Sequence, residues 1–184
     1  MKVVAQQWVS LDGYAAGPTG EAELFEAVDG ESDAASQRHN ADLLPTVGQV
    51  LLGRRSYESF SAYWPQADDP VARHVNAVPK VVFSRTLDAA PWGEHEPATV
   101  RTDVVEHVRA ARADGGGDLL LWGSLSLMAC LVEADELDEL DLFVAPVVLG
   151  DGTPLLPRGR RLALEQLSSE PLGGLTHVRH RVAR

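Results

Sequence analysis

Three short apolar runs that each end in Gly, Ser or Arg most limit the folds open to this chain. They lie over residues 51–56, 82–86 and 121–124, and a helical pattern follows the first and the third. Short apolar runs of this kind are typical of strands buried on both faces of a sheet. Since such strands alternate with helical segments, we predict an α/β protein with a mixed sheet.

The rest of the hydrophobic pattern fits this arrangement. Two closing strands, over residues 161–170 and 175–182, are predicted to form an antiparallel hairpin through Gly173-Gly174. Because the sequence has no internal repeat, low-complexity tract or linker, we expect a single domain over residues 1–184. The other expected strands cover residues 3–9, 47–52, 80–83, 98–101, 118–122 and 137–149, and the expected helices cover 21–44, 54–64, 103–113 and a segment from 125 onward.

Charge and composition exclude several classes of protein. The 184 residues include 27 Asp and Glu against 16 Lys and Arg, a formal net charge of −11 that would repel a nucleic-acid backbone. Cys130 is the only cysteine, so an intramolecular disulfide is excluded, and we expect its side chain in the core. The sequence shows no signal peptide and no apolar run of about 18 residues. We therefore expect a cytoplasmic protein with no membrane or nucleic-acid partner.

The polar residues that follow the three strands suit a phosphate-bearing ligand. The carboxyl ends of strands in an open α/β sheet form a ligand crevice, and helix N-termini there attract anions. Arg54 and Arg55 stand at a helix start, where their charges oppose the helix dipole, and a bound anion would explain both. Taken singly, each segment also fits an ordinary turn or helix cap. The three together favour a ligand with several phosphates, such as a dinucleotide, although no G-x-G-x-x-G follows the first strand.

These same segments carry a family resemblance. Residues 53–59 resemble the Gly-Arg-x-Thr-Trp/Tyr-Glu-Ser segment of dihydrofolate reductases, residues 82–85 resemble their second cofactor strand, and Gly123-Ser124 stands where they have Gly-Gly. Residues 10–13 and 138–152 are more similar to a sister group. That group contains the C-terminal reductase domain of the bifunctional riboflavin-biosynthesis deaminase-reductase and its stand-alone bacterial relatives. The resemblance implies a dihydrofolate-reductase-like three-layer fold, with a mixed, mostly parallel sheet flanked by helices and a C-terminal antiparallel hairpin.

The resemblance also implies NADPH as the cofactor. Ser124 is the one departure that changes the backbone environment, since it adds a Cβ where a Gly would approach phosphate. Its hydroxyl can equally cap the following helix. The residues that the resemblance assigns are Gly53, Arg54, Arg55 and Ser56 for the phosphates, Ser84 and Arg85 for the adenosine ribose and its 2′-phosphate, Gly123, Ser124 and Leu125 for the pyrophosphate, and Ala15 beside the nicotinamide.

The substrate side is less sharply marked in the sequence. Ser59 and Phe60 lie one helical turn beyond Ser56, and the matching positions of dihydrofolate reductases face the substrate. The alternative is a core Phe with a polar neighbour. Trp64 and Tyr14 are candidates for the apolar walls of a substrate pocket. The sequence does not distinguish this role from that of an ordinary core or rim residue.

The sequence offers one candidate for a polar catalytic or substrate-positioning residue, Asp12. The alternative for Asp12 is an Asx turn before Gly13. The carboxylate that dihydrofolate reductases use to bind the pterin has no matching motif here. A zinc-deaminase signature is also absent, and His177 and His180 fall on opposite faces of a strand, so we expect no metal site.

These observations favour an NADPH-dependent reductase of the 5-amino-6-(5-phosphoribosylamino)uracil reductase type. It would transfer a hydride to a small heterocyclic or ribitylated substrate. Two alternatives stay open: a dihydrofolate reductase, and a non-catalytic nucleotide-binding protein that keeps the cofactor cradle. The resemblance further implies a homodimer.

Overall fold

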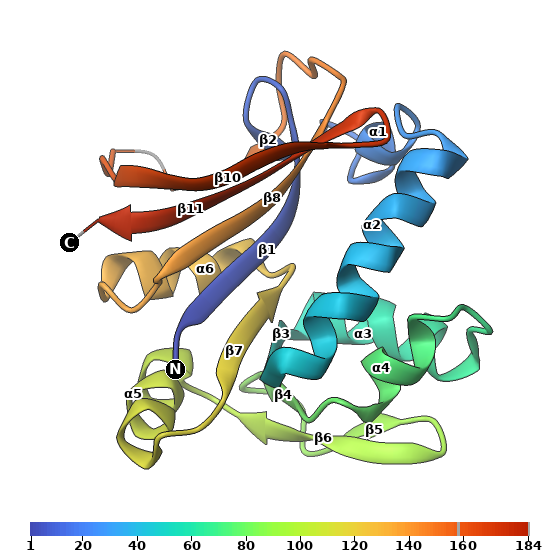
Figure 1. Ribbon diagram of the computed structural model, residues 1–184. Coiled ribbons are helices and arrows are strands. Elements are labelled where there is room, and N and C mark those ends of the chain that lie inside the picture. Colours follow the sequence, from blue (N-terminus) through green and yellow to red (C-terminus); the bar gives the residue numbers. More distant parts are fainter. Residues whose placement is uncertain (158, 184) are drawn as a thin grey trace. The chain divides into compact units, whose positions relative to one another are not determined.

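The computed structural model describes residues 1–157 and 159–183 (Figure 1). The chain folds into two compact units. The first contains Met1–Ala5 and His39–Leu137, and the second contains Gln6–Arg38 and the described residues from Asp138 onward. Strand β1 (Val3–Ser10) and helix α2 (Gly30–Leu43) each contribute residues to both units.

The first unit is built on mostly parallel strands. β3 (Val47–Gly53) pairs in parallel with both β7 (Asp118–Trp122) and β4 (Lys80–Phe83). β4 also pairs in parallel with β6 (His95–Arg101), and β5 (Ala90–Trp92) closes the edge as an antiparallel strand. The strand order is β1-β7-β3-β4-β6-β5. The predicted mixed α/β architecture is therefore confirmed.

Helices flank these strands, and their ends follow from local chemistry. In α5 (Val104–Asp114) the Asp103 carboxylate accepts hydrogen bonds from the N–H groups of Val105 and Glu106, and Gly115 ends the helix in the left-handed region at φ 70°. The other helices of this unit are α3 (Arg54–Tyr63), α4 (Ala72–Ala77), α6 (Leu125–Glu133), and the 3-10 turns Leu44–Thr46 and Trp64–Gln66.

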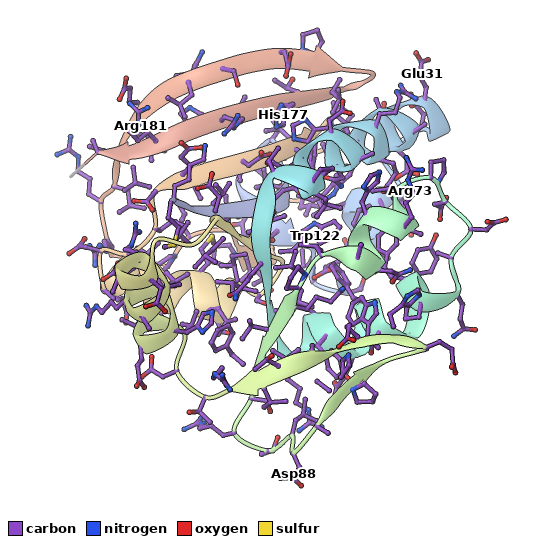
Figure 2. All side chains as sticks on the ribbon, turned by 60° about the horizontal axis from the view of Figure 1, so that its bottom comes forward. Glu31, Arg73, Asp88, Trp122, His177 and Arg181 are labelled. Carbon is purple, nitrogen blue, oxygen red and sulfur yellow. The ribbon has the colours of Figure 1, made fainter. Side chains whose placement is uncertain are left out.

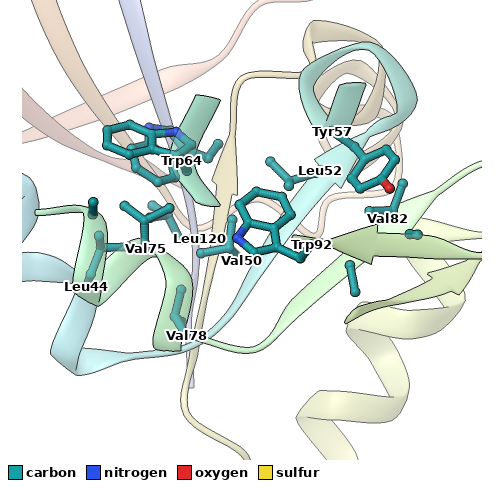
Figure 3. Packing of buried hydrophobic residues seen from close by; sticks show 14 of the residues in the cluster. Leu44, Val50, Leu52, Tyr57, Trp64, Val75, Val78, Val82, Trp92 and Leu120 are labelled. Atoms are coloured by element: carbon teal, nitrogen blue, oxygen red, sulfur yellow. The ribbon is translucent and has the colours of Figure 1, made fainter. Parts of the chain in front are cut away.

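The core of the first unit joins aliphatic strand residues to aromatic residues from helices and strands (Figure 3). Leu52 and Leu120 are almost fully buried, and they lie in one cluster with the rings of Tyr57, Trp64 and Trp92. Removing large apolar side chains from water stabilises a fold by about 1.5–3 kcal/mol each. The buried cluster therefore stabilises the strands whose ends carry the candidate site.

The second unit has an antiparallel sheet. β11 (Leu175–Ala183) pairs with β8 (Glu139–Ala145) on one side and with β10 (Ala163–Leu172) on the other, in the order β10-β11-β8-β1. The predicted hairpin through Gly173-Gly174 is present. A two-stranded sheet of β2 (Tyr14–Ala16) and β9 (Thr153–Pro154), and the short helix α1 (Ala22–Phe25), complete this unit.

A smaller apolar cluster holds the second unit together. Its fully buried members are Leu24, Phe143, Ala145 and Leu175. The ring of Trp8 packs against the ring of Phe143, with centroids 5.1 Å apart. Strand and helix of this unit thus share one core.

Several details differ from the sequence-based expectations. The side chain of Cys130 is exposed and not in the core, since its position on α6 faces away from buried Met128, Leu131 and Val132. The predicted strand over residues 137–149 is shorter, because its last residues form a loop. The elements β2, α4, β5 and β9 were not anticipated. Within the described residues, no helix is long and apolar enough to cross a membrane.

Candidate functional site

The three polar segments predicted from the sequence meet at one edge of the first unit. Gly53 ends β3 beside Phe83 at the end of β4, and Leu51 pairs with Leu121, one residue before β7 ends. The parallel register therefore aligns the carboxyl ends of the three strands. Helix α3 begins directly after Gly53, and α6 begins after Ser124. The edge thus carries two helix N-termini, which attract negative charge.

Hydrogen bonds that involve side chains join the three segments. The Gly53 N–H donates to Oγ of Ser124 over 2.6 Å, which links the β3 and β7 ends. Nη1 of Arg54 donates to Oγ1 of Thr86 over 2.8 Å, which links the β3 and β4 ends. The predicted juxtaposition of these segments is therefore a property of the folded unit.

The three arginines of the candidate site differ in the hydrogen bonds and ion pairs that they make. Nε of Arg54 donates to Oε1 of Glu58, one turn further along α3, over 2.7 Å. Arg55 and Arg85 are exposed, and neither makes a hydrogen bond or ion pair within residues 1–157 and 159–183. A guanidinium group has five N–H donors in a planar fork that suits phosphate. Arg55 and Arg85 therefore have their full donor capacity for an anionic ligand.

Ser84 is buried, and its hydroxyl oxygen is used within its own turn. Oγ of Ser84 accepts hydrogen bonds from the N–H groups of Thr86 and Leu87, both over 3.2 Å. A serine turn of this kind fixes the loop that presents Arg85. A contact between Ser84 and the ribose of a cofactor stays a prediction.

Gly123 and Ser124 both adopt left-handed backbone conformations, with φ of 69° and 64°. The side chain of Ser124 does not cap α6, so the capping alternative is wrong. Its Oγ instead contacts the Gly53 N–H and lies 2.9 Å from Oγ of Ser56. Leu125, the first residue of α6, is half-buried.

An aromatic group lies next to these polar residues in the same unit. Trp122 lies at the end of β7 (Figure 2). It stacks on Trp64 with ring centroids 6.0 Å apart, and the half-buried ring of Phe60 meets it edge-on at 5.1 Å. Trp64 is 8% exposed and belongs to the core cluster, as its core alternative expects. Ser59 is exposed on α3. Substrate contacts by Ser59, Phe60 and Trp64 stay predictions.

Asp12 and Ala15 belong to the second unit. The Asp12 carboxylate accepts hydrogen bonds from the Ser10 hydroxyl at 2.7 Å and from the N–H groups of Leu149 and Gly150 at 3.1 and 2.8 Å. The Ser10 hydrogen bond first, and then those of Gly150 and Leu149, hold the pKa of Asp12 below its ordinary value. Asp12 therefore ties two loops together as an ionised group, which suits a positioning role better than proton donation.

Ala15 lies on β2, which pairs with β9, and its side chain is buried. The loop over residues 10–20 is therefore held by a short ladder within the second unit. Contacts of Asp12 or Ala15 with a cofactor stay predictions.

One residue of the site and one contact within it were not found from the sequence. Thr86 shares the strand-end segment with Ser84 and Arg85, and its position beside them is the signal that could have marked it. The contact between the Ser56 and Ser124 hydroxyls joins residues 68 positions apart, and no local pattern announces it.

Comparison with known proteins places this geometry in a family. A family model of the RibD C-terminal domain matches residues 1–178. Two relatives are uncharacterized proteins of Bacillus subtilis (strain 168). YyaP is 27% identical over 161 residues, covering 84% of this chain and 79% of YyaP, and YwjB is 30% identical over 157 residues, covering 84% and 82%.

Solved structures show the same fold at lower identity. A putative riboflavin biosynthesis protein from Shewanella sp. PV-4 is similar over the full length of both chains, with a TM-score of 0.75 and 22% identity. A Thermotoga maritima diaminohydroxyphosphoribosylaminopyrimidine deaminase/5-amino-6-(5-phosphoribosylamino)uracil reductase matches 99% of this chain and 56% of its own, with a TM-score of 0.64 and 14% identity. Dihydrofolate reductase from Enterococcus faecalis, complexed with NADP(H), matches 100% and 97%, with a TM-score of 0.57 and 15% identity.

Proposed function

Because this chain belongs to the RibD C-terminal domain family, we propose that it is an NADPH-dependent reductase of small heterocyclic or ribitylated substrates. The observation that carries the proposal is the single edge formed by the ends of β3, β4 and β7. Two helix N-termini and a left-handed Gly-Ser turn gather there, with two guanidinium groups that have no partner among the described residues. This set of donors matches a ligand with phosphates at several points.

The residues at this edge fit a nicotinamide dinucleotide phosphate. Neither α3 nor α6 has an acidic residue in its first turn, so nothing there repels an anion. Arg55 would meet a phosphate at the start of α3, and Arg85 would meet the 2′-phosphate beyond β4. Gly123, Ser124 and Leu125 would receive the pyrophosphate at the start of α6.

In the reaction the protein would bind the cofactor and the substrate, orient them toward each other and shield them from water. When bound, the nicotinamide supplies the hydride, so the protein needs to provide geometry and to exclude water. The ring of Phe60, held edge-on by Trp122, offers an apolar surface of the kind that suits a planar heterocycle. Asp12 would orient the loops of the second unit and would not donate the proton, since its carboxyl group is held ionised.

For the substrate we propose a compound related to 5-amino-6-(5-phosphoribosylamino)uracil. Family membership and the Thermotoga maritima reductase support this choice. The fold likeness to the Enterococcus faecalis enzyme keeps dihydrofolate as the second candidate. We further propose that the protein acts as a homodimer in the cytoplasm, from the resemblance of the sequence to its family.

The test begins with cofactor binding by the wild-type protein. Isothermal titration with NADPH should give a saturable signal with a matching rise in melting temperature. Arg55→Gln should weaken this binding, and Arg73→Gln, which removes the same charge from the surface of α4, should leave it unchanged (Figure 2). Absence of NADPH binding to the wild type would overturn the proposal.

Substrate choice is tested by measuring NADPH oxidation in the presence of each of several candidate substrates. Turnover of 5-amino-6-(5-phosphoribosylamino)uracil, or of a close analogue, is the expected result, and turnover of dihydrofolate in its place would support the second candidate. Tight NADPH binding without turnover of any candidate substrate would favour the non-catalytic alternative. A monomer mass by light scattering would contradict the proposed homodimer.

A further inference from the structure

Ser124 occupies a backbone conformation that residues with a Cβ seldom adopt. Its φ and ψ are 64° and 65°, directly after Gly123 at φ 69°. Left-handed conformations are unfavourable for L-residues other than Gly, and non-Gly residues persist there where the surroundings compensate. The contacts of the Ser124 side chain are therefore the place to look for that compensation.

The Ser124 hydroxyl joins the starts of two helices. Its Oγ accepts the Gly53 N–H at 2.6 Å and lies 2.9 Å from Oγ of Ser56, in the first turn of α3. Ser124 itself is the residue from which α6 starts. One side chain thus fastens the β3–α3 loop to the β7–α6 loop, the two loops proposed to hold the cofactor phosphates.

The Ser56–Ser124 contact leaves little room for a Cβ at Gly53 or Gly123, and at Gly123 the φ of 69° is a further reason for glycine. A Cβ on Gly53 would lie 2.9 Å from Oγ of Ser124, and a Cβ on Gly123 would lie 2.9 Å from Oγ of Ser56. The φ of Gly53 is −77°, which any residue adopts, so the backbone angle gives no reason for glycine at this position. The close approach of the Ser124 hydroxyl gives that reason.

Counting hydrogen atoms shows what the pair still offers. Each hydroxyl has one hydrogen to donate, and one of the two is used between Ser56 and Ser124. The Gly53 contact uses an acceptor lone pair of Ser124 and no hydroxyl hydrogen. Neither hydroxyl has a further partner within the part of the chain that the structure describes. Whichever serine donates, one O–H of the pair stays free for an acceptor.

We propose that Ser124 is a positioning residue for the cofactor: its hydroxyl fixes the spacing of the two loops, and the Ser56–Ser124 pair presents one O–H to a pyrophosphate oxygen. This inference rests on the proposed function. The Ser124 hydroxyl thus serves cofactor binding together with Ser56, and it does not cap α6. Ser124 is also the cause of the glycine requirement at position 53.

The test uses Ser124→Gly and Ser124→Ala, measured for melting temperature and for the dissociation constant of NADPH. Ser124→Gly removes the hydroxyl but also relieves the left-handed backbone, so its melting temperature should stay near that of the wild type. Loss of the hydroxyl pair should still weaken NADPH binding about tenfold in both variants. Hydrogen exchange at the Gly53 amide should quicken in both.

A compensating pair makes the test independent of cofactor binding. Gly53→Ala should lower the melting temperature in the wild-type background, because its methyl group displaces the Ser124 hydroxyl. In the Ser124→Gly background the same change should cost little, since the next nearest atom to that Cβ, Cδ1 of Leu127, is 3.8 Å away.

The outcomes separate the two proposals. A wild-type protein that does not bind NADPH overturns the proposed function. The melting temperatures of Gly53→Ala in the wild-type and Ser124→Gly backgrounds would still test whether the Ser124 hydroxyl joins the two loops. A wild type that binds NADPH, with both Ser124 variants binding within about twofold of it, overturns the positioning role. Equal destabilisation by Gly53→Ala in the two backgrounds overturns the steric explanation.

Discussion

His177 lies between two carboxylates in the second unit. Its side chain lies on β11 (Figure 2). Its Nε2 is 2.8 Å from Oδ1 of Asp141, and both side chains are 1% exposed, while its Nδ1 is 3.2 Å from Oε1 of Glu170. Burial lowers the pKa of His177, but the hydrogen bonds and charges of Asp141 and Glu170 outweigh it, so the net shift is upward. The folded protein therefore favours the imidazolium form of His177 more than the unfolded chain does.

This arrangement predicts a loss of stability as the solution becomes alkaline. A raised folded-state pKa means that the contribution of His177 is complete below its ordinary pKa of 6.5 and is lost as the pH rises through the folded value. Urea unfolding at a series of pH values from 6 upward should show the decline. His177→Gln should flatten that part of the curve, and an unchanged slope in this variant would contradict the prediction.

The buried side chain of Lys80 leads us to predict the opposite trend at higher pH, a rise of folding stability with pH. Its Nζ donates to the carbonyl oxygens of Asn76 and Val78 and lies 4.6 Å above the Trp92 ring, and burial lowers its pKa to about 8. Between that value and the ordinary 10.5 the unfolded chain binds more protons. Stability should therefore rise with pH in this window. Lys80→Met should remove the rise, as measured by urea unfolding against the wild type.

Arg85 predicts selectivity between the two nicotinamide cofactors. Its guanidinium group is exposed and unpaired within the described residues, at the end of β4. If it meets the 2′-phosphate, Arg85→Gln should weaken NADPH binding by about 10- to 100-fold and leave NADH binding unchanged. Titration calorimetry with both cofactors measures this, with Arg73→Gln as the charge-matched control. An equal loss for both cofactors would place Arg85 elsewhere on the ligand.

Asp12 predicts a structural effect that can be separated from catalysis. Asp12→Ala removes the acceptor for the amides of Leu149 and Gly150, so hydrogen exchange at both should quicken, while Asp12→Asn keeps one oxygen and should retain part of the protection. The pKa of Asp12 is lowered, so its contribution is present above its ordinary 3.8 and is lost as the pH falls through the folded value. A fall in turnover without any change in exchange would point to direct catalysis.

Short-range hydrophobic patterns in the sequence predicted the central strands of the first unit, but not every helix or every buried residue. The strands that became β3, β4 and β7 were recognised because apolar residues cluster and end at Gly or Ser. The helix α4 was missed because Ala72–Ala77 is only six residues long, too short for buried Ala72 and Val75 to show a helical period in the sequence. Cys130 was misplaced because nearly every neighbour on α6 is apolar, and the rotation of the helix decides which of them is buried.

Contacts over long sequence distances account for the remaining differences. The sequence predicted a cofactor-binding role for Gly53, Ser56 and Ser124, but it did not predict that the hydroxyls of Ser56 and Ser124 touch. Ser84 is a predicted site residue, and its hydroxyl oxygen accepts hydrogen bonds within its own turn. Which polar atoms stay available to a ligand depends on partners that only the folded chain brings within reach.

The stacked rings of Trp64 and Trp122 give the protein an optical property of its own. Trp122 directly precedes Gly123, so an indole emitter lies one residue from the proposed pyrophosphate turn. Reduced nicotinamide absorbs near-ultraviolet light in the range where tryptophan emits, and the oxidised form does not. Occupation of the edge by the reduced cofactor should therefore quench indole emission by energy transfer, and hydride donation should restore it, so each turnover would be visible without an added dye.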